Sequence, residues 1–237
     1  MIDFTHRIVE RDYMFQTCVE GQRWSDIEEE LTPNENAKLW QQCGKIVKCI
    51  HETPGEQFGY PYPSRQFTSW SEMILGRFAR IYESMLAQQL EATVFKTISD
   101  IVRAHASILD EISTPHLLHG DLWTFNLLVA RSHDQPTIIG VLDADRAWWG
   151  DPMADWIMFL LAIRRDEPEW QPWLSAFYDG YGIPASGPAA HFRQEVYKTM
   201  HIGSAAVGAS RNGDGKTVAR ARRDLHEIAQ ELSLLQL

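Results

Sequence analysis

The sequence predicts an α+β fold, in which helices make up most of the chain and the strands are short and few. Across most of the 237 residues, apolar side chains recur every three or four positions, as they do in helices that pack on a core. Runs rich in β-branched and aromatic residues occur near the N-terminus and at about residues 126–144, which predicts two hairpins. We find no internal repeat and no low-complexity tract.

The composition excludes several classes of function. A content of 44% hydrophobic and 23% charged residues is ordinary for a soluble globular protein. The net charge of −10, with no long basic run, argues against a nucleic-acid partner. No apolar run approaches the roughly 18 residues of a membrane span, and the first residues lack a signal-peptide core. Cys18, Cys43 and Cys49 show no metal-site spacing and are expected to be buried, reduced thiols of a cytoplasmic protein.

The N-terminal segment predicts a hairpin. The runs "FTHRIVE" (residues 4–10) and "YMFQTCVE" (residues 13–20) have the composition of strands and are separated by Arg11-Asp12. Gly21 ends the second run, and the pattern becomes helical after it.

A complete helix signature follows in "LTPNENAKLWQQCGKIVKCIHETPG" (residues 31–55). Thr32 can cap the helix, Pro33 suits its first turn, and Glu35 completes a Thr-x-x-Glu capping box. Pro54-Gly55 ends the helix. The apolar residues between these signals fall on one face: Leu39, Cys43, Ile46, Val47 and Ile50.

The hydrophobic period changes near the middle of the chain. The segments "NLLVA" and "TIIGVLDA" predict two strands joined by the polar turn "RSHDQP". Helical periodicity surrounds this hairpin, and the helices that it predicts lie at about residues 70–90, 93–112, 153–165, 170–180, 190–206 and 217–235. The segment "RNGDGKT" lacks the first glycine of a P-loop, because position 210 is Ser210, and is expected to be a loop between helices.

Three polar side chains near the predicted hairpin indicate chemistry. Asp121 and Asn126 lie in "LLHGDLWTFNLLV" (residues 117–129), and Asp143 follows the second strand. Because a hairpin brings its first and last residues together, Asn126 and Asp143 should be adjacent and could offer hard oxygen ligands to Mg²⁺. Asp121 could orient a hydroxyl and accept its proton, which is the division of roles in kinases. The simpler alternative is a polar loop satisfied by its own turns and caps.

The block "LLHGDLWTFN", followed by "VLDADRAWWGDPMADW", resembles the aminoglycoside phosphotransferase and choline kinase-like family, which has a protein kinase-like fold. The resemblance implies that Asp121 is the catalytic base and that Asn126 and Asp143 bind Mg²⁺. It implies that backbone groups near Cys18 and Val19 form a hinge that pairs with the adenine of ATP or another nucleoside triphosphate. Four further roles come with the resemblance. Asp155 would brace the catalytic loop by hydrogen bonds, His119 would shape that loop, and Asp145 would assist the metal or substrate or cap the strand end. The side chains of Trp148 and Trp149 would wall a substrate pocket, or at least one of them would pack in the core.

The resemblance also implies how the chain divides. Residues 1–21 would be a remnant of the N-terminal β-lobe, with two strands and a hinge, and residues 22–237 the mainly helical C-terminal lobe. The phosphate-covering loop and the nucleotide-binding lysine of the family are not found, since no lysine precedes Gly21, which is itself the first glycine. We therefore expect an exposed N-terminal strand edge that favours self-association. Whether this chain alone transfers phosphate is left open.

Three functions remain for comparison with the structure. The first is a phosphotransferase that moves the ATP γ-phosphate to a hydroxyl of a small molecule. The second is a non-catalytic remnant of the kinase fold or a binding module. The third is an unrelated metal-dependent hydrolase that uses the same carboxylates. The sequence does not identify the phosphate acceptor.

Overall fold

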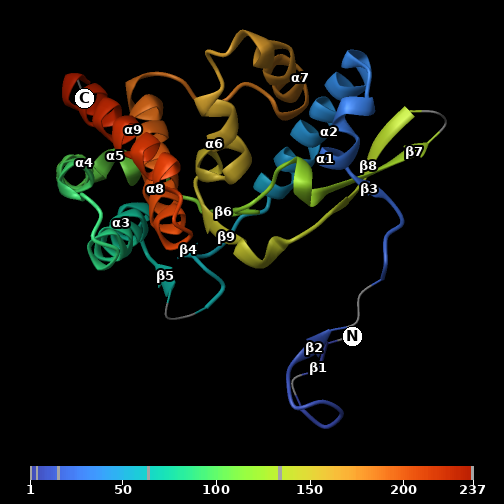
Figure 1. Cartoon of the computed structure of the whole chain (residues 1–237), viewed down its shortest axis with the longest axis horizontal. Helices are drawn as coiled ribbons and strands as arrows, with labels where there is room; N and C mark the ends of the chain where they lie inside the picture. The colour runs from blue at the N-terminus through green and yellow to red at the C-terminus, as the bar shows by residue number, and fades with distance from the viewer. Residues whose placement is uncertain (1, 4, 15–16, 63–64, 133–134, 236–237) are drawn as a thin grey trace.

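The computed structural model describes residues 2–3, 5–14, 17–62, 65–132 and 135–235, and it confirms the α+β class (Figure 1). The helices are α1 (Trp24–Ile27), α2 (Pro33–His51), α3 (Trp70–Ala87), α4 (Thr93–Ala104), α5 (Ala106–Leu109), α6 (Trp156–Ile163), α7 (Gln171–Tyr181), α8 (Pro188–Arg211) and α9 (Gly215–Leu234). The strands are β1 (Ile2–Asp3), β2 (Tyr13–Met14), β3 (Gln22–Arg23), β4 (Phe58–Gly59), β5 (Gln66–Phe67), β6 (His116–Leu118), β7 (Leu127–Ser132), β8 (Gln135–Val141) and β9 (Trp148–Gly150). Within these residues, every ladder between named strands is antiparallel, in the orders β1-β2, β3-β7-β8 and β5-β4-β9-β6.

Helix α2 begins with the capping box that the sequence predicts. The Thr32 hydroxyl accepts a hydrogen bond from the Glu35 backbone N–H at 3.3 Å, and a Glu35 carboxylate oxygen accepts one from the Thr32 N–H at 3.0 Å. Further along, α2 crosses α7 so closely that a Cβ on Gly44 would lie 2.2 Å from the Phe177 carbonyl oxygen. Glycine at position 44 therefore permits the close approach of these two helices (Figure 1).

We expect the substitution Thr32→Ala to lower the free energy of unfolding by about 0.5–2 kcal/mol, because the Glu35 N–H loses its acceptor. Urea denaturation followed by circular dichroism measures this change. Ser113→Ala, in an exposed turn, is the matched control and should change stability by less than about 0.5 kcal/mol. Equal stability of the two variants would contradict a stabilising role for the capping box.

The buried apolar side chains form two clusters. The first lies among α3, α4, α8 and α9, and its fully buried members include Trp70, Met73, Phe78, Phe95, Phe192 and Met200. The second joins α1, α2 and α7 to β7, and its fully buried members include Trp24, Leu39, Cys43, Val47, Leu127 and Phe177. Strands β6 and β9 carry core residues such as Leu118 and Trp148, so the segments that flank the 119–126 loop are anchored in the interior.

The predicted N-terminal hairpin is much shorter than expected. Pairing is restricted to Ile2 with Met14 and Asp3 with Tyr13, and residues 4 and 15–16 lie outside the described residues. The strands predicted over 4–10 and 13–20 are therefore wrong in extent. A strand is stabilised by lateral partners and by a buried face, and residues 5–12 are exposed. In Figure 1 the hairpin lies apart from the helical body, and the predicted self-association through its edge stays a prediction.

The expectation of buried thiols holds for one cysteine. Cys43 is fully buried in α2, and burial raises the pKa of its thiol to about 12. Cys18 and Cys49 are exposed, so the prediction was wrong for these two residues.

The helices predicted after the first hairpin are confirmed with small shifts of their ends. The stretch predicted over 93–112 is interrupted at His105, where the backbone leaves the helical region and α5 begins. The "RNGDGKT" segment forms the turn between α8 and α9, and the Asp214 carboxylate caps α9 by accepting from the Lys216 and Thr217 N–H groups. No helix in the described ranges is long and apolar enough to cross a membrane.

Helix α8 carries a histidine that burial keeps neutral. Burial lowers the pKa of His201 to about 3, and the positive charge of Arg77 lowers it further, against the opposing effects of the Ala154 carbonyl and Asp155. In the unfolded chain this imidazole gains a proton near pH 6.5, whereas in the folded protein it does so only near pH 3. Its contribution to stability is therefore fully present above pH 6.5 and is lost progressively as the pH falls toward 3.

We expect the substitution His201→Gln to flatten the dependence of unfolding free energy on pH between about 6 and 4.5. The difference in slope should approach one proton, or about 1.4 kcal/mol per pH unit. Urea titrations at several pH values measure it, and His226→Gln, on the exposed face of α9, is the control that should keep the wild-type slope. Parallel curves for wild type and His201→Gln would show that His201 titrates normally.

Candidate active site

The loop that contains Asp121 leaves β6 through a turn that requires glycine. Gly120 has a φ of +82°, and a Cβ at this position would lie 2.3 Å from the carbonyl oxygen of Arg146. Strand β6 pairs with β9, with Leu118 opposite Trp148. The loop at 119–121 is therefore packed directly against the segment that follows Asp143.

Asp155 braces the loop at residues 119–121 through hydrogen bonds, as the family resemblance implies. One carboxylate oxygen accepts hydrogen bonds from the His119 N–H at 2.9 Å and from His51 Nε2 at 2.9 Å. The other accepts from the Gly120 N–H at 2.8 Å and from the Trp156 N–H at 2.7 Å, which also caps α6. Asp155 is completely buried; burial by itself raises the pKa of its carboxyl, but these hydrogen bonds and the charge of His51 lower it overall.

The network continues away from the loop through His51, at the end of α2. Its Nε2 faces the ionised Asp155 and its Nδ1 lies 3.0 Å from the Tyr181 hydroxyl, at the end of α7. Burial raises the pKa of Tyr181, so its hydroxyl stays protonated at neutral pH. The loop is thus joined by hydrogen bonds to two helices that are far away in the sequence.

Asn126 and Asp143 come together as the hairpin geometry predicts. The Leu142 N–H donates to the Asn126 carbonyl at 2.8 Å, and Leu127 is paired with Val141. The Asn126 side-chain amide donates to the Asp121 backbone carbonyl at 2.7 Å, which directs its Oδ1 away from that bond. Asp143 is exposed and has a left-handed backbone, with a φ of +63°. All three predicted residues therefore belong to one local cluster.

Asp121 lies in a mixed electrostatic environment. Its carboxylate is largely buried, and an Arg146 guanidinium nitrogen lies 3.3 Å from one of its oxygens. Burial raises the pKa of Asp121, the charge of Arg146 opposes that rise, and the negative charges of Asp143 and Asp145 add to it. A carboxylate with a raised pKa is a better proton acceptor than an ordinary surface aspartate.

The remaining predicted residues lie in different surroundings. Cys18 and Val19 lie in exposed chain between β2 and β3, and their predicted contact with adenine stays a prediction. Trp148 is buried in the core, where Tyr60 stacks on its ring at 6.0 Å. His119 is buried, and neither of its ring nitrogens has a hydrogen-bond partner within the described part of the chain.

Sequence reasoning missed the partners of the predicted residues. Arg146 directly follows the acidic pair Asp143 and Asp145, which was the available signal for a counter-charge beside Asp121. The link from His51 to Tyr181 had no local signal, because 130 positions separate the two residues.

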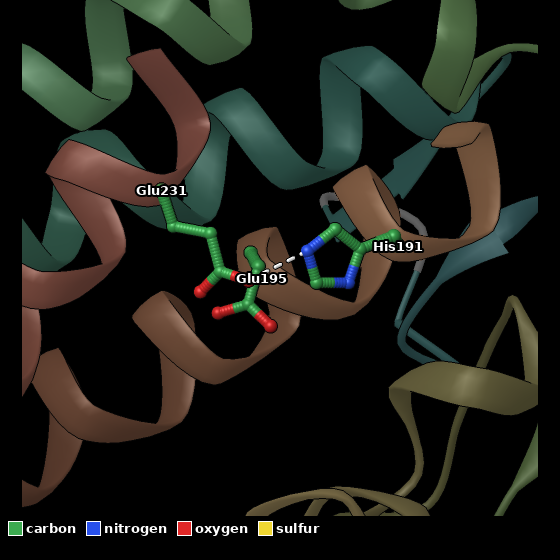
Figure 2. Close-up of side chains that lie close together, drawn as sticks. All are labelled: His191, Glu195 and Glu231. Carbon is green, nitrogen blue, oxygen red and sulfur yellow. Dashed lines mark ion pairs between the residues drawn. The ribbon is translucent and has the colours of Figure 1, made fainter. Parts of the chain in front are cut away.

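A second group of polar side chains lies between α8 and α9. One possible metal-ligand atom from each of His191, Glu195 and Glu231 lies within 4.8 Å of the others (Figure 2). His191 forms an ion pair with Glu231 at 2.7 Å, and Lys198 forms one with the buried Glu195 at 2.5 Å. Each carboxylate therefore has a partner of its own, and the group joins the two helices.

A cavity of about 550 Å³ lies apart from the Asp121 cluster. It is lined by α6, α7, α8 and the 183–187 segment. Asp121, Asn126 and Asp143 are not among its lining residues.

Comparison with known proteins gives a family match. The model of a family described as "Phosphotransferase enzyme family" matches residues 5–193. A probable ketoamine kinase of Synechocystis sp. is 24% identical over 178 residues, which cover 70% of this chain and 56% of that protein. The chain thus spans just over half the length of this curated relative.

Solved structures share the fold at low sequence identity. A "putative aminoglycoside phosphotransferase" of Ralstonia eutropha JMP134 has a TM-score of 0.72 at 14% identity, over 100% of this chain and 78% of its own. A variant of the aminoglycoside phosphotransferase APH(4)-Ia, in a ternary complex with AMP-PNP and hygromycin B, has a TM-score of 0.60 at 20% identity, over 89% of this chain and 69% of its own. The predicted protein kinase-like fold is confirmed.

Proposed function

This chain belongs to the phosphotransferase enzyme family, and from that premise we propose that it transfers the γ-phosphoryl group of ATP, or of another nucleoside triphosphate, to a hydroxyl of a small molecule. The observation that carries the proposal is the cluster of Asp121, Asn126 and Asp143, held together by the amide-to-carbonyl hydrogen bond and by the hairpin register. Its support from relatives is that a protein of the same fold has been solved in a ternary complex with AMP-PNP and hygromycin B.

In the proposed reaction Asp121 is the base. Its raised pKa and its position at the mouth of a braced loop suit it to orient the acceptor hydroxyl and to take its proton. The acceptor oxygen bonds to the γ-phosphorus, the bond from that phosphorus to the bridging oxygen breaks, and the nucleoside diphosphate leaves. The Arg146 guanidinium lies beside Asp121 and places a positive charge next to the proposed base.

The donor set fits a magnesium ion. Asn126 Oδ1, which faces away from the Asp121 carbonyl, and the exposed Asp143 carboxylate are hard oxygen donors of the kind that Mg²⁺ shares with phosphate oxygens. An ion held there would supply positive charge beside the phosphate oxygens. This chain's own residues supply the remaining functions: Asp155 and Gly120 position the loop, and Asp121 handles the proton.

Two measurements on the full chain test the proposal. The first is calorimetric binding of Mg²⁺ and ADP, with Asp143→Asn as the variant that should weaken it. The second is ADP release with a panel of hydroxyl compounds that includes sugars, amino alcohols, ketoamines and aminoglycosides. We expect nucleotide binding and transfer to at least one compound. Failure of both would contradict the proposal and would favour a non-catalytic member of the family.

A further inference from the structure

A small cavity beside the β4–β5 ladder is lined by four arginines. Arg77 and Arg80 come from α3, Arg211 from the end of α8, and Arg65 from the segment before β5. The cavity has a volume of about 270 Å³, and Tyr60 forms part of its wall. Of the described residues that line it, none is an aspartate or a glutamate.

These four arginines lack the carboxylate partners that six other described arginines have. The following arginines form ion pairs with carboxylates: Arg131, Arg146, Arg164, Arg165, Arg193 and Arg220. Over the ranges that the structure describes, no carboxylate pairs with any of the four in the cavity. In a chain with a net charge of −10, four unneutralised guanidinium groups around one hollow indicate a site for an anion.

Arg77 is the most buried of the four arginines that line the cavity. Its guanidinium is partly buried, donates a hydrogen bond to the Tyr60 hydroxyl at 2.5 Å, and lies 5.2 Å from the centre of the Trp148 ring. Burial lowers the pKa of Arg77, and the positive charges of Arg80 and Arg146 lower it further. A buried cation is costly unless an opposite charge accompanies it, and an anion in the cavity would supply that charge.

Arg146 connects the cavity with the candidate active site. Its charge acts on Arg77, which lines the cavity, and one of its guanidinium nitrogens lies 3.3 Å from an Asp121 carboxylate oxygen. Trp148, two positions after Arg146 in the sequence, contacts both Arg77 and Tyr60. A small molecule with its anionic group among the arginines could therefore extend toward the proposed base.

We propose that this cavity binds the phosphate group of the acceptor, so that the acceptor is a hydroxyl compound that already carries a phosphate. The role as an acceptor site rests on the proposed phosphotransferase function, whereas anion binding does not. Four guanidinium groups match the charge and the three oxygens of a phosphomonoester better than the single charge of a carboxylate, because guanidinium binds phosphate through paired N–H donors. The acceptor's own phosphate stays unchanged while its hydroxyl reacts.

Anion binding is tested directly, without catalysis. Inorganic phosphate and acetate are titrated into the full chain by calorimetry, at low ionic strength. We expect phosphate to bind more tightly than acetate, and the double variant Arg80→Met/Arg211→Met, which changes exposed side chains, to bind phosphate at least about tenfold more weakly. Arg103→Met, on the exposed face of α4, is the control for the loss of a surface arginine and should bind like wild type. No phosphate binding by wild type, or equal binding by the double variant, would overturn the site.

The acceptor role is tested with matched pairs of probes. ADP release is compared for glucose with glucose 6-phosphate and for ribose with ribose 5-phosphate. We expect the phosphorylated member of a pair to be preferred, and the double variant to raise its KM while leaving the KM of ATP unchanged. Equal use of both members by wild type would overturn the acceptor class. Phosphate binding that the double variant loses, with no ADP release from any probe or from the hydroxyl panel, would overturn the proposed function and support the anion site alone.

Discussion

Replacing Asp121 with asparagine is expected to slow phosphoryl transfer by about 10²–10⁴-fold, because asparagine cannot accept the proton of the acceptor hydroxyl. The substitution should not disturb the loop. The Asn126 amide bonds to the backbone carbonyl of residue 121, and Asp155 holds the loop through backbone N–H groups. The binding of Mg²⁺ and ADP should therefore change little, and the loss should appear in kcat.

The measurement is ADP release at saturating nucleotide, with the acceptor that the hydroxyl panel identifies. Asp179→Asn, an exposed carboxylate on α7, is the matched control and should keep the parent rate. Thermal unfolding of both variants establishes that the fold is intact. If the Asp121→Asn variant keeps the activity of the parent, Asp121 is not the base and the proton leaves by another route.

Replacing Asp155 with asparagine is expected to lower the free energy of unfolding by about 3–5 kcal/mol. Each oxygen of this fully buried carboxylate accepts from two donors, which are contributed by His119 and His51 on one side and by Gly120 and Trp156 on the other. An asparagine turns one oxygen into an amide group that donates, so that two buried donors lose their acceptor whichever way the amide faces.

Two measurements separate this effect from a general loss of stability. Chemical denaturation gives the change in unfolding free energy, and hydrogen exchange reports the backbone amides of His119 and Gly120 individually. We expect one of the two amides to lose protection in the Asp155→Asn variant, because they bond to different oxygens and the remaining carbonyl oxygen serves only one of them. Asp166→Asn, on the surface, is the control and should match wild type in both respects. An unfolding free energy within about 1 kcal/mol of wild type, with both amides still protected, would contradict the bracing role.

The Asp155 network also gives the loop a dependence on pH. The pKa of Asp155 is lowered in the folded protein, so its contribution to stability is present above the ordinary pKa of an aspartate and is lost as the pH falls through the folded value. At neutral pH the loop is therefore held by an ionised carboxylate, which accepts stronger hydrogen bonds than a neutral acid.

Several features of the fold followed from short-range patterns in the chain. The capping box of α2 depends on contacts between Thr32 and Glu35, three residues apart, and the β7–β8 hairpin on a polar turn between two apolar runs. The same hairpin placed Asn126 beside Asp143, because the register of a hairpin follows from its turn. These predictions needed only interactions between near neighbours in the sequence.

The N-terminal hairpin shows where such reasoning fails. Residues 4–10 and 13–20 have the composition of strands, but a strand forms only where another strand and a core lie alongside it, and composition does not report these partners. For the same reason the exposure of Cys18 was not predicted.

Near-neighbour patterns in the chain were sufficient to establish that this protein has a helical body with a catalytic-type loop and hairpin, because periodicity, caps and turns act within a few residues. Only the folded arrangement decided how that loop is supported and which charges surround it. His51, Asp155 and Tyr181 are brought together from three helices or their ends, and four arginines from α3, α8 and the segment before β5 gather around one cavity. Electrostatic and hydrogen-bonding energies depend on distance in space and on burial, and neither quantity is contained in spacing along the chain.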